Sequence, residues 1–168
     1  DGTSRLTRPL KSRDTTLMGD ALEALGATIT RDGTVWTITP ADLDHVVAAT
    51  VDCGLAGTVM RFVPPVAALT NADITFDGDE HARVRPMSTT ISTLRALGVD
   101  VDDQDRGALP FTVRGSGRVA GGALEIDASS SSQFVSALLL AGARFDSGLE
   151  LPHTGAALPS LRPRGVAV

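Results

Sequence analysis

The chain has 168 residues, of which 42% are hydrophobic, so it is long enough for one globular domain with a sizeable core. Its formal net charge of -5 argues against a nucleic-acid partner, because neutralising phosphates requires a basic face that this composition does not supply. A single cysteine, Cys53, excludes an intrachain disulfide and a cysteine-based zinc cage. No apolar run approaches the length of about 20 residues that spans a bilayer, so we expect a soluble, cytoplasmic chain without membrane contact.

The first predicted elements are a helix, two strands and a second helix. Gly26 follows the last apolar position of an amphipathic helix, where a residue with left-handed backbone geometry often ends helices. A short strand follows, and the turn Arg31-Asp32-Gly33 separates it from an alternating strand over residues 35–39, which predicts a hairpin. Small residues around Gly57 then open an apolar helix over residues 59–69, which leads to another short strand.

The same order of elements recurs in the second half of the chain. The segment Glu23-Ala24-Leu25-Gly26-Ala27-Thr28-Ile29 reappears 72 residues later as Arg95-Ala96-Leu97-Gly98-Val99-Asp100-Val101. A turn at residues 104–107 and a strand over residues 110–114 predict a second hairpin. A second apolar helix, over residues 134–143, completes the copy.

A third copy should follow, because such units cannot bury their apolar faces alone and need neighbours to complete a common core. The pattern of the third copy begins but stops after Leu161, because Pro163 and Gly165 are not compatible with a helix in the last residues. We therefore expect residues 1–161 to form part of a domain, with residues 162–168 as a divergent tail that does not match the repeat. The incomplete copy also predicts an uncovered apolar face and marginal stability.

Two helix openings at equivalent positions of the repeat are candidates for anion binding. Gly57 and Thr58 begin one helix, and Ser131-Ser132-Gln133 begins the other, so free backbone N–H groups and the helix dipole would face a ligand. Ordinary capping is the alternative, because Ser and Thr are common N-cap residues. Equivalent positions of a repeat should lie at the same end of a domain, which favours a single anion-binding rim.

Two arginines lie next to these openings. Arg85 precedes Pro86, which marks a predicted helix start at its first turn, and Arg61 lies one turn into the helix that Gly57 opens. A guanidinium group can clamp phosphate or carboxylate in bidentate geometry. A solvated surface arginine is the alternative at both positions.

Other polar patterns favour structural roles. The second hairpin carries the acidic residues Asp100, Asp102, Asp103 and Asp105. Their alternation with strand residues predicts a solvated hairpin face and not a metal site. Cys53 is a weak candidate for a nucleophile, because only its proximity to a helix start would lower the pKa of its thiol.

Three segments together resemble signatures of 5-enolpyruvylshikimate-3-phosphate synthase, both in order and in spacing. They are Gly54-Leu55-Ala56-Gly57-Thr58-Val59-Met60-Arg61, the stretch 78–86 that ends in Arg85-Pro86, and Ser131-Ser132-Gln133-Phe134. The opening Leu10-Lys11-Ser12-Arg13-Asp14-Thr15 is also similar to the first repeat of that family. The resemblance covers residues 4–161.

The resemblance implies an α/β (α+β) fold, the inside-out barrel of the enolpyruvyl transferases. Each of two domains would contain three βαβαββ units, with helices inside and sheets outside, and this chain would hold two units and a truncated third from the N-terminal domain. The family is a target of glyphosate and acts in the shikimate pathway of aromatic amino acid biosynthesis. Its members transfer the enolpyruvyl group of phosphoenolpyruvate to the 5-hydroxyl of shikimate 3-phosphate and release phosphate.

The resemblance also implies a role for individual residues. Shikimate 3-phosphate would be held by Ser131, Ser132, Gln133 and Ser160. The phosphoenolpyruvate site would be lined by Gly57, Thr58, Arg85 and Gln133. No cofactor or metal is implied, and the expected partners are these two small molecules and a second domain of the same enzyme.

Parts of the family's active site are not expected in this chain. The N-terminal Lys-Ser and Arg motif would precede Asp1, and the acidic base with its Lys and Arg partners belongs to the second domain. We therefore expect this chain to be inactive alone. Two alternatives stay open: a UDP-N-acetylglucosamine enolpyruvyl transferase, and a non-catalytic half of a split enzyme that only binds phosphorylated ligand. The Ser-Ser-Gln-Phe motif and the position of Cys53 argue against the first.

Overall fold

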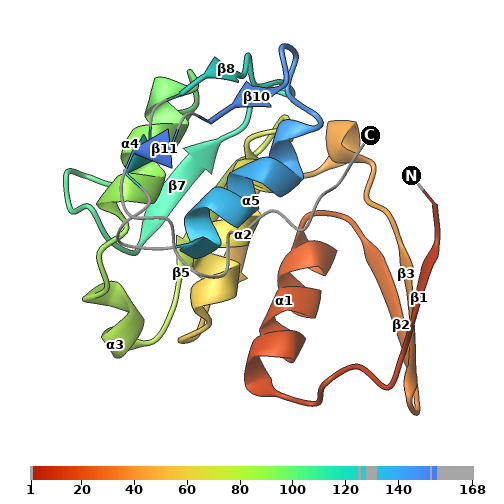
Figure 1. Ribbon diagram of the computed structural model, residues 1–168. Coiled ribbons are helices and arrows are strands. Elements are labelled where there is room, and N and C mark those ends of the chain that lie inside the picture. Colours follow the sequence, from red (N-terminus) through yellow and green to blue (C-terminus); the bar gives the residue numbers. More distant parts are fainter. Residues whose placement is uncertain (1, 125, 128–131, 152, 155–168) are drawn as a thin grey trace.

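The computed structural model describes residues 2–124, 126–127, 132–151 and 153–154 (Figure 1). The first half of the chain forms β1 (Ser4–Thr7), α1 (Arg13–Ala24), β2 (Thr28–Asp32), β3 (Val35–Thr39), the 3-10 turn η1 (Leu43–His45), β4 (Ala49–Asp52), α2 (Gly57–Ala67) and β5 (Asp73–Asp77). The second half forms α3 (Glu80–Arg83), α4 (Ser88–Ala96), β6 (Asp100–Asp102), β7 (Phe111–Arg114), β8 (Gly122–Ala123), β9 (Ile126–Asp127), α5 (Ser132–Gly142), β10 (Leu149–Glu150) and β11 (His153–Thr154).

The ends of the repeated helices follow from local chemistry. The Ser12 hydroxyl caps α1 by accepting a hydrogen bond from the Thr15 amide at 3.1 Å. After α1 and α4, Gly26 and Gly98 take φ values of 90° and 85°, the left-handed geometry that a residue without Cβ adopts at little cost. The sequence predictions for these two glycines are confirmed.

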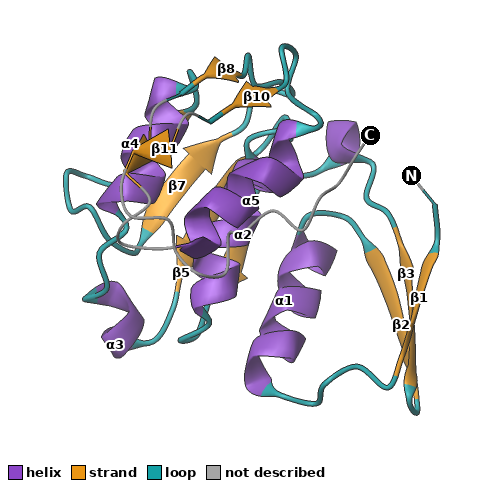
Figure 2. Ribbon diagram, viewed as in Figure 1, coloured by secondary structure: helices purple, strands orange, loops and turns teal. Residues whose placement is uncertain are grey.

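The two predicted hairpins form, but they belong to different sheets (Figure 2). The β2–β3 hairpin pairs with β1 in a three-stranded antiparallel sheet of order β1-β3-β2. The β6–β7 hairpin instead adds to β5 in a four-stranded sheet of order β4-β5-β7-β6, where β4 and β5 run parallel. Two short parallel pairs, β8 with β10 and β9 with β11, complete the described strands.

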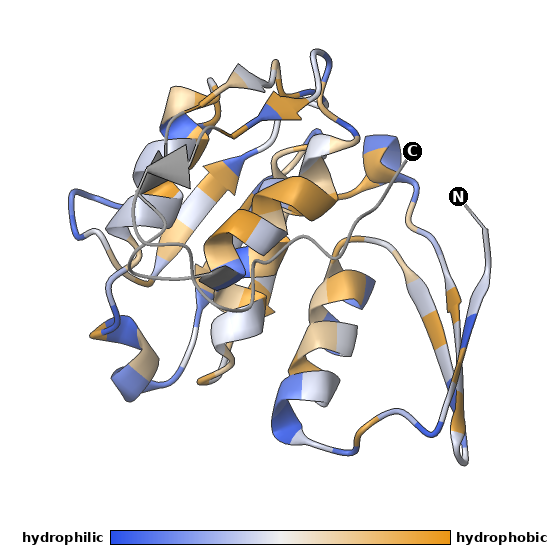
Figure 3. Cartoon of the chain, viewed as in Figure 1, coloured by the Kyte–Doolittle hydropathy of each residue, from blue (hydrophilic) through white to orange (hydrophobic). Residues whose placement is uncertain are grey.

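The centre of the apolar core lies between the four-stranded sheet and the helices on one of its faces. Helices α2 and α5 lie side by side, and α2 also contacts β5 and β7 (Figure 1). Phe76 and Phe111 stack with ring centroids 5.2 Å apart. Figure 3 shows the apolar residues concentrated on α2, α5 and β7. Buried residues alternate with more exposed ones along β5 and β7, so one face of this sheet belongs to the core.

The three-stranded sheet is covered less completely. A cavity of about 560 Å³ lies between this sheet and α1, and its lining includes the apolar residues Leu6, Leu10, Met18, Leu22, Ile29, Trp36 and Ile38. On α5, Leu139 and Leu140 are 55% and 71% exposed. The uncovered face that the incomplete repeat predicts stays a prediction. No helix among the described residues is long and apolar enough to cross a lipid bilayer.

Two details differ from the sequence predictions. Pro86 was expected in the first turn of a helix, but α4 begins only at Ser88, because its N-cap residue Met87 has φ and ψ of -120° and 2°, outside the helical region. The short helix α3 was not predicted, since a single turn carries no measurable periodicity.

Candidate functional site

The site is built around the first turn of α2. This helix begins at Gly57, and its N-cap residue Ala56 has no side chain that accepts a hydrogen bond from the first turn. Amide groups at the start of a helix have no partners within the helix, and the helix dipole gives this end a partial positive charge. The first turn of α2 therefore favours an anion.

Three polar side chains converge on Gly57. A Cβ atom placed on Gly57 would lie 3.1 Å from Arg61 Nη1, 3.4 Å from Gln133 Oε1 and 3.5 Å from Arg85 Nη2. These side chains come from α2, from α5 and from the segment that joins α3 to α4. Glycine leaves open the space that any larger residue would fill. The four residues, Gly57, Arg61, Arg85 and Gln133, are called the arginine rim below.

The two rim arginines lack carboxylate partners within the described part of the chain. Arg85 donates through Nη1 to the Leu55 carbonyl at 2.9 Å, and Arg61 donates through Nη1 to the Gly57 carbonyl at 3.3 Å. Burial, and then the positive charge of Arg85, lower the pKa of Arg61. Two cations held side by side without an acidic partner repel each other, and a bound anion would relieve that repulsion.

Backbone contacts hold the loop before α2 against the segment that leads to Arg85. The Asp79 amide donates to the Gly54 carbonyl at 3.1 Å, and the Cys53 amide donates to the Asp77 carbonyl at 2.7 Å. A Cβ on Gly78 would lie only 2.6 Å from the Gly54 carbonyl oxygen, so this approach needs a glycine. The contact fixes Arg85 relative to the start of α2.

Comparisons with known proteins identify the family. The model of the EPSP synthase family, described as 3-phosphoshikimate 1-carboxyvinyltransferase, matches residues 1–162. The chain belongs to the EPSP synthase family. It is 54% identical over 159 residues to the 3-phosphoshikimate 1-carboxyvinyltransferase of Mycobacterium ulcerans (strain Agy99), covering 95% of this chain and 36% of that relative. The chain thus spans about a third of the length of this relative.

Solved structures of the EPSP synthase family share the fold of this chain. Two structures of EPSP synthase from Acinetobacter baumannii match with a TM-score of 0.81 and 23% sequence identity, and both matches cover 94% of this chain. The matched part amounts to 36% and 37% of those chains. At this identity the match establishes the mixed α/β fold alone.

The EPSP synthase motifs named from the sequence can now be located. Gly57, Arg85 and Gln133 are brought together, while Thr58 lines the neighbouring apolar cavity. Ser132 begins α5, which places the openings of α2 and α5 at the same end, as the repeat predicts. Two further predicted ligand residues, Ser131 and Ser160, lie outside the described residues, as does the tail 162–168.

Arg61 is the rim residue that sequence reasoning singled out least. Its motif placed it on the helix that Gly57 opens, but a solvated surface position was the favoured interpretation. The signal was the spacing of four residues between Gly57 and Arg61, which puts both on the same side of a helix. Only the position of Arg61 Nη1 beside Gly57, where Gln133 and Arg85 also converge, shows that this side faces the rim.

The structure also tests the sequence interpretations of Cys53 and of the acidic hairpin. The thiol of Cys53 is fully buried, and its pKa is raised to about 12 by burial and by the charges of Asp52 and Asp77, so it is not an activated nucleophile. The prediction of a solvated acidic hairpin was wrong for Asp103, which is 2% exposed and hydrogen-bonded to Arg95. Asp100 and Asp102 do lie on the exposed side, where both pair with Arg114.

Proposed function

We propose that this chain supplies the phosphoenolpyruvate-binding part of a 3-phosphoshikimate 1-carboxyvinyltransferase. The observation that carries the proposal is the arginine rim, with two guanidinium groups and one side-chain amide around an unfilled space at a helix start. Phosphoenolpyruvate carries a phosphate and a carboxylate, which match paired guanidinium groups and free backbone amides. The family match and the name of the relative from Mycobacterium ulcerans support the same assignment.

The proposed reaction adds the 5-hydroxyl of shikimate 3-phosphate to C2 of phosphoenolpyruvate while C3 gains a proton. The resulting tetrahedral adduct then loses a proton from C3 and eliminates phosphate to give 5-enolpyruvylshikimate 3-phosphate. Arg61 and Arg85 would stabilise the phosphate as charge develops on its bridging oxygen. Gln133 would share the rim with both substrates, and Ser131, Ser132 and Ser160 would hold the shikimate phosphate.

Catalysis is proposed for the full-length enzyme and not for this chain alone. The chain spans 36% of the length of its relative from Mycobacterium ulcerans. We propose that residues 1–161 are the greater part of an N-terminal domain with the βαβαββ units of an inside-out barrel. The remaining acid, base and cationic groups would come from the rest of the enzyme, with this chain binding phosphorylated ligands. The family match favours this assignment over a UDP-N-acetylglucosamine enolpyruvyl transferase.

The test is calorimetric titration of phosphoenolpyruvate into the chain and into two arginine variants. Arg85→Gln should weaken binding about tenfold or more, because a charge-assisted contact to the anion is lost. Arg83→Gln removes the same charge two residues away, where the arginine pairs with Asp77, and should change the affinity less than about twofold.

Equal losses of phosphoenolpyruvate affinity in the two arginine variants would show that general electrostatic attraction alone accounts for binding. Failure of the folded chain to bind phosphoenolpyruvate would contradict the proposal, unless adding the remainder of the enzyme restores binding. For shikimate 3-phosphate the matched pair of variants is Gln133→Ala and Gln104→Ala. Gln133→Ala should weaken binding. Gln104 is the control, because its side-chain oxygen accepts a hydrogen bond from Arg106 away from the rim.

A further inference from the structure

Arg85 lies in the short connection between α3 and α4, and that connection is anchored on both sides. On one side the Arg85 amide donates to the Ala82 carbonyl at 3.0 Å. On the other side the Met87 amide donates to the Gly107 carbonyl at 2.8 Å, and Met87 has no side-chain cap for α4. The path of the backbone through Arg85 therefore depends on where the turn containing Gly107 lies.

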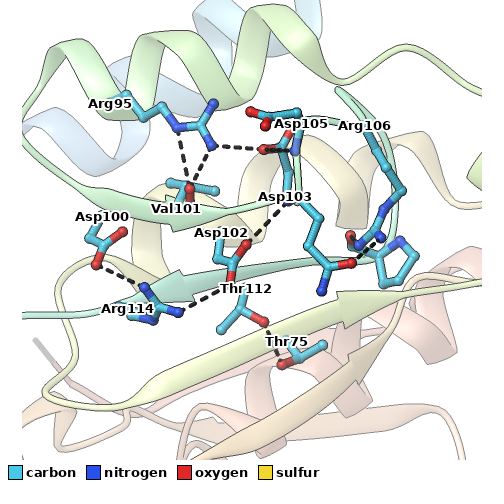
Figure 4. A network of polar contacts seen from close by, with 12 residues as sticks. Thr75, Arg95, Asp100, Val101, Asp102, Asp103, Asp105, Arg106, Thr112 and Arg114 are labelled. Carbon is cyan, nitrogen blue, oxygen red and sulfur yellow. Dashed lines mark hydrogen bonds and ion pairs between the residues drawn. The ribbon is translucent and has the colours of Figure 1, made fainter.

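Asp103 fixes that turn (Figure 4). Its Oδ2 accepts a hydrogen bond from the Gly107 amide at 2.7 Å, and its Oδ1 accepts one from the Asp105 amide at 3.2 Å. Asp103 itself is 2% exposed, so its carboxylate is largely removed from water and depends on these amides and on Arg95 for its hydrogen bonds. Losing the carboxylate would remove both hydrogen bonds that close the turn and release it.

Arg95 ties the same carboxylate to α4. Its Nη2 donates to Asp103 Oδ1 at 2.7 Å, and its Nε and Nη2 donate to the Val101 carbonyl at 3.2 and 2.7 Å. The turn is thus attached to α4 twice, through Met87 at the helix start and through Arg95 in the last turn. Two attachment points restrain both the position and the orientation of the helix start relative to the turn.

We propose that Asp103 is a positioning residue for Arg85, acting through Gly107 and Met87 to hold the guanidinium at the arginine rim. This inference rests on the proposed function of Arg85 in binding phosphoenolpyruvate. Asp102 offers a contrast one residue away, because its carboxylate pairs with Arg114 on the exposed face of the sheet and accepts the Gln104 amide. It has no hydrogen-bonded link to Met87 among the described residues.

The first test reads the Arg85 side chain directly and needs no ligand. The Nε–Hε resonance of Arg85, assigned by its loss in Arg85→Lys, is followed by NMR in Asp103→Asn and in the control Asp102→Asn. Asp103→Asn should shift or broaden the Arg85 signal and shift the Gly107 amide signal. The signal of Arg118, which pairs with Asp146, should stay in place, because a general loosening of the fold would move both.

The second test measures phosphoenolpyruvate affinity in the same variants by calorimetry. A misplaced guanidinium should weaken binding about tenfold in Asp103→Asn, with no change in Asp102→Asn. If Asp103→Asn does not fold, Arg95→Gln is used, since Arg95 is 45% exposed and its loss spares the Gly107 contact in part. Arg95→Lys keeps a cation at the carboxylate and should restore part of the affinity.

The outcomes separate the two proposals. If the Gly107 amide moves while the Arg85 signal and the affinity stay unchanged, the positioning role is overturned. It is equally overturned if the Arg85 signal moves without any effect on measurable binding. If phosphoenolpyruvate binds neither the unmodified chain nor the chain with the remainder of the enzyme added, the assignment of the rim fails. The Arg85 resonance alone then decides the positioning role: a shift supports it and an unchanged signal overturns it.

Discussion

Two regions of the molecule carry equivalent hairpins but bury them to different degrees. In the open region, α1 with the sheet β1-β3-β2, β2 buries only Ile29 and no residue of β3 is fully buried. In the closed region, the sheet β4-β5-β7-β6 with α2, α4 and α5, the strand residues Ile74, Phe76, Phe111 and Val113 are at most 1% exposed. Similar local sequences thus reach different degrees of burial.

The difference shows that neighbours, and not the hairpins themselves, decide how much apolar surface is buried. The β6–β7 hairpin joins strands from the first copy and lies under helices, whereas the main neighbours of the β2–β3 hairpin are β1 and α1. The arginine rim is built from elements of the closed region. A site that must hold like charges close together needs such firmly packed supports.

The largest expected effect comes from truncating the centre of the closed region. Phe111→Ala should lower the free energy of unfolding by about 3–5 kcal/mol, because it removes a buried ring that stacks on Phe76. Ile38→Ala, in the half-buried β3, should cost about 1 kcal/mol or less. Urea unfolding of both variants measures the contrast, and similar costs at the two positions would show that the regions are equally well packed.

Gly57→Ala should separate binding from stability. The added Cβ would enter the space between Arg61, Gln133 and Arg85, so phosphoenolpyruvate affinity should fall about tenfold or more, while stability should change by less than about 1 kcal/mol. Gly98→Ala is the converse control. Its φ of 85° disfavours a side chain, but nothing lies within 4 Å, so it should lose stability and keep affinity. The same response in both variants would contradict this description of the rim.

Acid should weaken the closed region through Asp103. Burial opposes ionisation of this carboxyl group, but hydrogen bonds from Arg95, Gly107 and Asp105 outweigh it, so its pKa lies below the ordinary value of 3.8. The stabilisation is therefore complete above about pH 5 and is lost as the pH falls through the ordinary pKa toward the folded one. Asp103→Asn should cost roughly 1–2 kcal/mol at pH 6, and the difference from the unmodified chain should shrink toward pH 3. Urea unfolding across this range checks it, and a difference that stays constant with pH would show that the carboxylate is not responsible.

The smallest expected effect is the binding of a dye to the open region. The dye 1-anilinonaphthalene-8-sulfonate should bind in the apolar cavity beside α1, because Trp36 and six other apolar side chains line it. Trp36 is the single tryptophan of the chain, so excitation of tryptophan should transfer energy to the bound dye. Trp36→Phe should abolish the transfer. Dye emission without transfer would contradict binding in this cavity.

Several features could be predicted from the sequence because they depend on neighbouring residues. Gly26 and Gly98 end their helices, and the strand over residues 35–39 forms with the predicted bounds, because turn geometry and side-chain alternation are local properties. The start of α2 at Gly57 and its likeness to the start of α5 were also visible as a repeat. These features, and the motifs that resemble the EPSP synthase family, each depend on a short stretch of sequence.

The tertiary structure alone decided which distant residues meet. Nothing near Asp103 in the sequence distinguishes it from Asp102. Yet Asp103, just past the end of β6, is buried and bonds Arg95, whereas Asp102 pairs with Arg114 on the exposed side of the sheet. Likewise, Arg61 and Arg85 are 24 residues apart and become neighbours only when the Gly54 and Gly78 backbones pack together. Contacts of this kind depend on the burial of whole surfaces, and local sequence patterns do not encode which surfaces will pair.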